Sequence, residues 1–263
     1  MATSTDPTLR RTAHEIFEHV EDSAHSELRR STHALAFSGL AGGFSMGLTG
    51  LAVAAATVAL GDTPGHQFLA YTVYPLGFIA VIIGRAQLFT ENTLYPVALL
   101  LDERRHFADT ARLWSVVFVC NVVGAAGFSA LATRSQALNE PIRNALIQLG
   151  SVAAQGSAAH IFWSGVIGGW LIALVAWMVT ASHWTIGQIA VIWLLTFVVG
   201  IGHFAHCIAS TGEIMSAVLG GALPLSRYMQ WLALATSGNI AGGVFIVTML
   251  NFGQVKAGES PRR

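Results

Sequence analysis

Residues 84–93, with the sequence GRAQLFTENT, interrupt an apolar run that extends from about residue 67 to residue 100. Residues 200–206, GIGHFAH, interrupt a second apolar run, from about residue 185 to residue 222. Each run is longer than the ~25 residues at which a single membrane crossing normally ends. Non-helical backbone at membrane depth is tolerated only where protein buries it or where it lines a cavity. We therefore predict that each run consists of two half-helices joined by a loop.

The distribution of charge predicts further membrane spans around these two broken runs. Only 11% of the 263 residues are charged, and 69 consecutive residues between Arg143 and Glu213 contain no Asp, Glu, Lys or Arg. A helix that spans a bilayer needs about 20 mostly apolar residues. The sequence therefore predicts an all-α integral membrane protein with six spans, at about residues 34–60, 67–100, 113–133, 160–181, 185–222 and 229–252.

The remaining composition argues against several other classes of protein. Lys and Arg total 14, as do Asp and Glu, and this balance is not that of a nucleic-acid-binding domain. Cys120 and Cys207 lie in apolar runs and indicate neither a disulfide framework nor a zinc cage. No HExxH motif, Ser/His dyad or carboxylate pair is evident, so we expect no enzyme, no cofactor and no nucleic-acid partner. His203 and His206 lack a third ligand nearby in sequence, so we expect no metal there.

The basic residues outside the spans predict the orientation and the domain limits. Ten Arg and Lys residues fall on the side of the N-terminus and three on the opposite side, which predicts cytoplasmic N- and C-termini. We expect an N-terminal segment, residues 1–33, with an amphipathic helix over residues 8–30. A single channel domain follows over residues 34–253, and residues 254–263 form a short cytoplasmic tail. The expected location is a bacterial inner (plasma) membrane.

Three motifs recur in the same order in the two halves of the chain. They are SGxxGG followed by an aromatic residue at 38–44 and 164–170, a glycine with a polar residue at 84–85 and 202–203, and Asn-x-x-Gly at 121–124 and 239–242. Because each half contains three spans, an odd number, the second copy is predicted to enter the membrane inverted. Inverted repeats with broken helices are typical of transport proteins, whose substrate path lies at the repeat interface.

The motifs resemble those of the formate/nitrite transporter family over about residues 30–253. The resemblance rests on Leu88-Phe89-Thr90 at the first break, His206 at the second, Asn121, Asn239, and residues 162–178 (FWSGVIGGWLIALVAWM). Aquaporins share the six spans and the inverted repeat, but they carry an Asn-Pro-Ala triplet at each half-helix start that this chain lacks.

The resemblance implies a homopentamer in membrane lipid, with one pore in each protomer. It implies small monovalent anions of weak acids as substrates: formate, nitrite, hydrosulfide, acetate or lactate. It also implies a central histidine, His206, that faces Thr90 between two apolar constrictions. The other implied pore residues are Asn121 and Asn239 beside the loops, and Tyr74, Phe78, Leu88 and Val199 at the constrictions.

The chain also departs from the family pattern at several positions. The family's lysine before the fourth span is absent, because residues 144–159 contain no Lys or Arg. Arg85 replaces a glycine, and Glu91 follows the loop threonine. Arg85, Glu91 and His203 are candidates for a gate, with an ion pair between Arg85 and Glu91 as the structural alternative. A channel for neutral or cationic solutes is the alternative function, and proton coupling through the histidine is left open.

Two features suggest caps at the starts of the second half-helices. Thr90, Asn92 and Thr93 are candidate N-caps after the first break, and Ser210 and Glu213 have the spacing of a capping box after the second.

Overall fold

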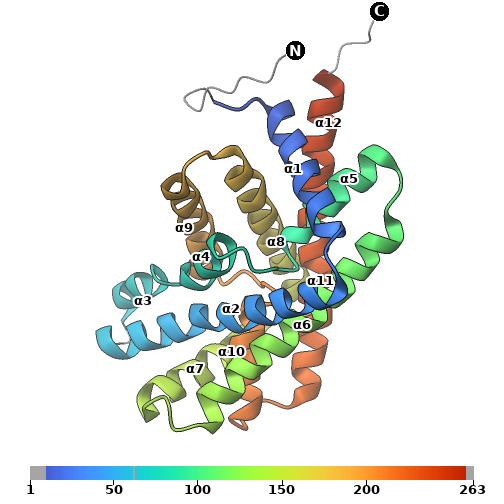
Figure 1. Cartoon of the computed structure of the whole chain (residues 1–263). Coiled ribbons are helices and arrows are strands. Elements are labelled where there is room, and N and C mark those ends of the chain that lie inside the picture. Colours follow the sequence, from blue (N-terminus) through green and yellow to red (C-terminus); the bar gives the residue numbers. More distant parts are fainter. Residues whose placement is uncertain (1–9, 62, 259–263) are drawn as a thin grey trace, which may run out of the picture.

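The computed structural model describes residues 10–61 and 63–258, and over these ranges the chain is helical with no strand (Figure 1). The predicted all-α class is confirmed. Five stretches within these ranges are long and apolar enough to cross a membrane: Thr32–Leu60, Gly65–Ile83, Phe107–Arg134, Ala158–Ala181 and Leu225–Gly258. The apolar helix α9, Thr185–Ile201, is shorter. The count of six spans and the inverted orientation of the second half stay predictions.

Both long apolar runs are broken in the structure. The first contains α3 (Pro64–Tyr71), α4 (Leu76–Ile83), a loop, a 3₁₀ turn (Glu91–Thr93) and α5 (Tyr95–Glu103). The second contains α9, a loop and α10 (Ala209–Leu219). We call residues 84–94 the first loop and residues 202–208 the second loop. One further helix, α7 (Glu140–Ala153), lies outside the six predicted spans and begins with a cap from the Asn139 side chain.

The predicted helix caps after the breaks are wrong. The N-cap of α10 is Ile208 and that of α5 is Leu94, and neither makes a side-chain cap bond. Instead, the Ala209 N–H donates to Nδ1 of His206 at 3.0 Å. The physical reason is that the loop histidine already satisfies this backbone donor at the start of α10, which leaves Ser210 and Glu213 available for other contacts.

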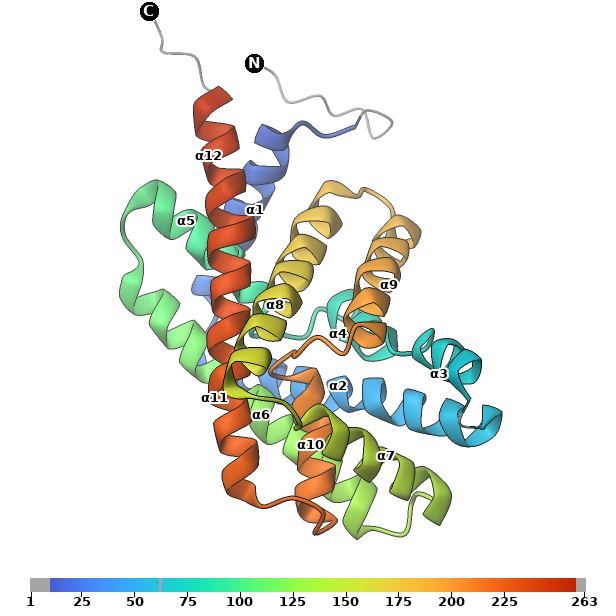
Figure 2. The same cartoon turned by 180° about the vertical axis from the view of Figure 1, so that it is seen from behind.

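Two helix pairs form the framework on which the loops rest. Helix α2 (Thr32–Leu60) packs along α6 (Phe107–Arg134), and α8 (Ala158–Ala181) packs along α11 (Leu225–Ala241). Figure 2 shows α11 continuing into α12 (Met249–Gly258) as one long helix beside α8, through a π-helical segment at Gly242–Thr248. A methyl group on Gly43 would overlap the Asn121 carbonyl oxygen, and one on Gly169 would overlap the Asn239 carbonyl oxygen. The helices of each pair can therefore approach this closely only with glycine at these positions.

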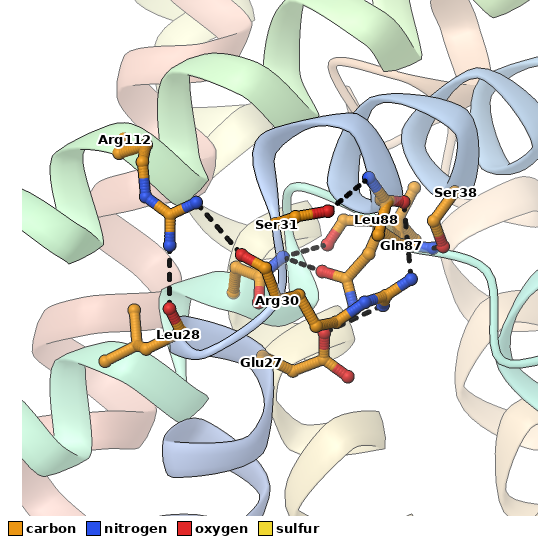
Figure 3. A network of polar contacts seen from close by, with 10 residues as sticks. Glu27, Leu28, Arg30, Ser31, Ser38, Gln87, Leu88 and Arg112 are labelled. Carbon is orange, nitrogen blue, oxygen red and sulfur yellow. Dashed lines mark hydrogen bonds and ion pairs between the residues drawn. The ribbon is translucent and has the colours of Figure 1, made fainter.

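The N-terminal helix α1 (Ala13–Leu28) packs against α5, and its C-terminal end is held by α6. Its buried residues are the five expected from the amphipathic pattern: Ile16, Phe17, Val20, Ala24 and Leu28. The Arg112 guanidinium donates to the carbonyl oxygens of Leu28 at 2.7 Å and Arg30 at 3.0 Å (Figure 3). These bonds satisfy backbone acceptors where α1 ends, and they fix α1 relative to the long helices.

Candidate functional site

Both breaks begin with the same backbone turn. Arg85 and His203 have left-handed φ angles of 57° and 51°. The N–H of the residue that follows each of them donates to the carbonyl oxygen five residues earlier. These bonds are Ala86 N–H to Val81 O and Phe204 N–H to Val199 O, both at 3.0 Å. A left-handed conformation costs a non-glycine residue roughly 1–2 kcal/mol. Glycine adopts this conformation without such a cost, so it suits position 85, where the resemblance implies a glycine.

Asn121 of α6 holds the first loop through its side-chain amide. Its Oδ1 accepts from the Phe89 N–H at 2.8 Å, and its Nδ2 donates to Gln87 O at 2.9 Å and to Gly39 O at 2.7 Å. All three partners are backbone groups, two of them in the loop. One buried side chain therefore satisfies loop groups that would otherwise lie unpaired at membrane depth.

Asn239 of α11 makes the same three contacts to the second loop. Its Oδ1 accepts from the Cys207 N–H at 2.8 Å, and its Nδ2 donates to Ala205 O and Gly165 O, both at 2.8 Å. Every partner lies at the position that corresponds to a partner of Asn121 in the sequence repeat. The side chains of Asn121 and Asn239 contact loop backbone, so their direct function is to position the loops.

Two serines complete this loop support, and the sequence analysis gave them no role. Ser38 Oγ accepts from the Gln87 N–H at 3.1 Å, which Figure 3 shows beside the start of α2. Ser164 Oγ accepts from the Ala205 N–H at 2.9 Å. Both serines open the repeated SGxxGG motif, and this repetition was the signal that could have identified them.

The two loops meet at Thr90 and His206. Thr90 Oγ1 and His206 Nε2 lie 2.8 Å apart, and both residues are fully buried. The Phe78 ring packs edge-on against the His206 ring, with 5.1 Å between the centroids. The structure thus brings together the two residues that the sequence placed at the centre of the pore.

Two cavities are lined by residues that neighbour this contact in the sequence. The larger cavity, about 600 Å³, is lined by Tyr74, Val199, Ala205 and other residues. The smaller cavity, about 190 Å³, is lined by Leu88 and other residues. The linings include the sequence neighbours of the central pair, Ala205 beside His206 in the larger cavity and Glu91 beside Thr90 in the smaller one.

The four predicted constriction residues border these cavities or the central pair. Tyr74 and Val199 line the larger cavity, Leu88 lines the smaller one, and Phe78 contacts His206. Each of them is at most 4% exposed. The four side chains are therefore buried and mostly apolar, and they line the cavities or contact the central histidine.

The ionisable side chains divide between the two cavities. Arg85, Glu91 and Glu27 line the smaller cavity, and within residues 10–61 and 63–258 no ion pair joins Arg85 to Glu91. His203 lines the larger cavity and lies 3.3 Å from the Tyr71 hydroxyl. Arg85 and Glu91 are therefore together, while His203 is apart from them. Their function as gates stays a prediction.

Glu213 was predicted to be a helix cap, but it does not cap α10 and instead lines the larger cavity. It lies inside α10, and its Cγ is close enough that a methyl group on Gly50 would approach it to 2.7 Å. A carboxyl group within a membrane span is costly unless it faces a cavity or a partner. The signal was its position at the end of a 69-residue stretch without charged side chains.

Comparisons with known proteins agree with this geometry. A family model described as formate/nitrite transporter matches residues 14–253. The inner membrane protein YfdC of Escherichia coli K12 is 34% identical over 252 residues, which cover 94% of this chain and 80% of that protein. A probable formate transporter of Methanothermobacter thermautotrophicus is 34% identical over 196 residues, which cover 68% of this chain and 71% of that protein.

Two solved structures share the fold. An FNT family ion channel superposes with a TM-score of 0.81 at 18% sequence identity, covering 91% of this chain and 98% of that one. A pentameric formate channel with formate bound superposes with a TM-score of 0.66 at 19% identity, covering 89% and 98%. At these identities the likeness establishes the arrangement of helices.

Proposed function

The chain belongs to the formate/nitrite transporter family, and from this premise we propose that it is a channel for small monovalent anions of weak acids, with His206 and Thr90 as its central binding pair. The proposed substrate is one or more members of this class: formate, nitrite, hydrosulfide, acetate or lactate. The observation that carries the proposal is the buried contact of Thr90 with His206, whose sequence neighbours Glu91 and Ala205 line two cavities.

The hydrogen bonds around His206 indicate which of the two residues, Thr90 or His206, donates in their contact. Nδ1 accepts the Ala209 N–H, so it carries no proton, and the neutral imidazole holds its proton on Nε2. Nε2 therefore donates to Thr90 Oγ1. The Thr90 hydroxyl keeps its own proton and can donate it to a solute. A pair that presents hydrogen-bond donors suits an anion and does not suit a bare cation.

The surroundings lower the cost of moving an anion through this site. An anion in an apolar constriction loses its hydration, which is costly unless donors replace the water. The second loop leads into the first turn of α10, where the helix dipole places partial positive charge. In the proton-coupled form of the proposal, one proton enters from the aqueous side together with the anion. The His206–Thr90 pair holds it next to the solute and is neutral again once the solute has left as the neutral acid.

Replacing His206 with Phe tests the proposal in liposomes that contain the purified protein. The phenyl ring retains similar bulk but offers no hydrogen bond, so we expect flux of the transported anion to fall at least about tenfold. His206→Asn keeps a neutral donor and acceptor, so its flux should survive with an altered pH dependence. Size-exclusion chromatography checks that both variants assemble. Normal flux through an assembled His206→Phe channel would refute the central-pair proposal.

A second candidate function is a channel for neutral or cationic solutes. A carboxyl group lines each cavity, Glu91 in the smaller and Glu213 in the larger, and residues 144–159 supply no Lys or Arg. Reversal potentials in planar bilayers distinguish the two functions. Under a salt gradient, the reversal potential should lie near the equilibrium potential of the anion if the first function holds. It should lie near the equilibrium potential of the cation if the second function holds.

We also propose a homopentamer of protomers that each contain a pore. Large apolar side chains remain on the protomer surface, including Phe37, Trp163 and Ile186, which are 73%, 64% and 74% exposed. Such side chains face either lipid or a neighbouring protomer. The related solved channel is described as pentameric. The proposed location is a bacterial inner membrane with both termini in the cytoplasm.

A further inference from the structure

Three metal-binding side chains converge where α1 meets the connection between α5 and α6. His25 Nε2 lies 2.9 Å from Glu103 Oε1, and His106 Nε2 lies 3.1 Å from Glu103 Oε2. The one ligand atom that each residue offers lies within 4.8 Å of the others. Neither the channel function nor the helix packing described above uses this cluster.

The donor set suits a divalent transition metal such as zinc. Two imidazole nitrogens and one carboxylate oxygen are a recurrent set of three zinc ligands, with a fourth position left for water. Zinc binds such atoms at roughly 2.0–2.2 Å, so neighbouring ligands in a tetrahedral site lie about 3.3 Å apart. The two His–Glu separations, 2.9 Å to Oε1 and 3.1 Å to Oε2, are close to this value, although each histidine faces a different oxygen of the carboxylate. Small side-chain rotations would bring all three atoms around one ion.

The orientation of the rings also favours a metal. The His25 and His106 rings are nearly perpendicular, at 88° with 5.9 Å between centroids, and each presents its Nε2 to the same carboxylate. On its other side, His106 Nδ1 faces Asp109 Oδ2 at 3.8 Å. This separation is longer than a hydrogen bond, so Asp109 would have to move closer to act as the carboxylate that fixes the tautomer of a ligating histidine.

The cluster is accessible but not fully exposed. The side chains of His25, Glu103 and His106 are 34%, 21% and 23% exposed. The group that competes for the carboxylate is Arg105, which pairs with Glu103 Oε2 and is itself 67% exposed. Because the Arg105 side chain lies largely in solvent, a metal ion can displace it at a modest cost.

We propose that His25, Glu103 and His106 bind one zinc-class divalent cation, which links α1 to the α5–α6 connection. His25 belongs to α1, Glu103 ends α5, and His106 precedes α6. The ion would therefore join segments that lie about 80 residues apart in the sequence. This site is independent of the proposed transport, and it can exist whether or not His206 binds a solute.

The test measures zinc binding to the full-length protein in detergent, after removal of any polyhistidine tag and treatment with a chelator. Competition with a chromophoric chelator should give one zinc per protomer. His25→Gln, Glu103→Gln and His106→Gln should each weaken the affinity at least about tenfold. Co²⁺ should bind in the same place and show the visible absorption of a tetrahedral site.

Two control variants make the outcome decisive. His19→Gln changes an exposed histidine on the same helix, away from the cluster, and should leave zinc affinity unchanged. Arg105→Gln frees the Glu103 carboxylate from its competitor, so zinc should bind more tightly. The proposal is overturned if His19→Gln and His25→Gln weaken binding equally, or if no variant changes it. Size-exclusion profiles confirm that each variant remains folded.

Discussion

At the residue scale, the side-chain amides of Asn121 and Asn239 match the backbone groups that they contact. Each amide supplies one acceptor to a loop N–H and two donors to carbonyl oxygens, one in the loop and one in a neighbouring helix. An aspartate has the same shape but would turn an oxygen toward two carbonyl oxygens. The chemistry of the contact therefore demands asparagine rather than a small polar residue in general.

This requirement predicts the effect of Asn239→Ala. The change leaves three buried backbone groups without their partner, at about 1–3 kcal/mol for each unsatisfied group. We expect a large fall in the apparent melting temperature of the purified protein in detergent. Asn251→Ala is the matched control, because within the described residues the Asn251 amide donates one hydrogen bond, to Val247 O four residues earlier in the π-helical segment. Equal effects of the two variants would contradict the proposed loop support.

Sequence reasoning found the residues whose chemistry is unusual for their surroundings. Thr90 and His206 are polar residues inside apolar runs, and a membrane makes such residues conspicuous. The reasoning failed at Glu213 because Ser210 and Glu213 have the spacing of a capping box. The side chain of His206, which lies in the loop before the helix, accepts the first backbone N–H of α10 instead. Local spacing cannot reveal that a loop side chain has already satisfied the backbone donor.

At the scale of the elements, the glycines set the distance between paired helices. Gly43→Ala would place a methyl group on the Asn121 carbonyl oxygen, so α2 and α6 would have to separate. We expect lower thermal stability and loss of flux, since Asn121 would move with its helix. In Gly253→Ala nothing lies within 4 Å of the new methyl group, so stability should be unchanged or slightly higher. If the melting curves of Gly43→Ala and the wild type were indistinguishable, the contact between Gly43 and the Asn121 carbonyl would not be tight.

The docking of α1 predicts a pH dependence of stability. Burial and the nearby Asp102 raise the pKa of Glu21 to about 7, Lys256 lowers it, and Glu103 raises it further. In the unfolded chain this carboxyl has a pKa of about 4.3. Between these values the folded protein binds more protons than the unfolded chain, so stability falls as the pH rises through this window.

Melting temperatures of chelator-treated protein at pH 5, 6, 7 and 8 measure this contribution. Glu21→Gln removes the titrating group, so the component that falls with rising pH should disappear in the variant. Asp22 is the neighbouring exposed acid on the same helix, and Asp22→Asn should retain the wild-type profile. A Glu21→Gln profile parallel to that of the wild type would refute the raised pKa.

At the scale of the whole molecule, the sequence predicted the broken runs but not how distant segments meet. The half-helices were visible because polar loops interrupt apolar runs. Helix α7 was not predicted because it is too short and too polar to resemble a membrane span. The His25–Glu103–His106 cluster could not be predicted, since it depends on where α1 docks. Contacts between segments far apart in sequence leave no local pattern.

The arrangement of the connections gives the orientation prediction a structural basis. Figure 1 shows the start of α1, the end of α12 and the α5–α6 connection toward one end of the molecule, and the α6–α7 and α10–α11 connections toward the other. Arg104 and Arg105 lie in the first group. Arg134 and Arg143 flank the α6–α7 connection, and Arg227 follows the α10–α11 connection. The excess of basic residues therefore lies at the end that carries the termini, which predicts that this end is cytoplasmic.

Cysteine labelling tests this orientation in right-side-out vesicles, using a variant in which Cys120 and Cys207 are replaced by alanine. A membrane-impermeant maleimide added outside should modify a cysteine at position 136, in the α6–α7 connection, and leave one at position 105 unmodified. Arg105 is 67% exposed and Gln136 is also exposed, so access to solvent does not bias the comparison. After the vesicles are permeabilised, both positions should react. Labelling of position 105 but not of position 136 from outside would reverse the orientation.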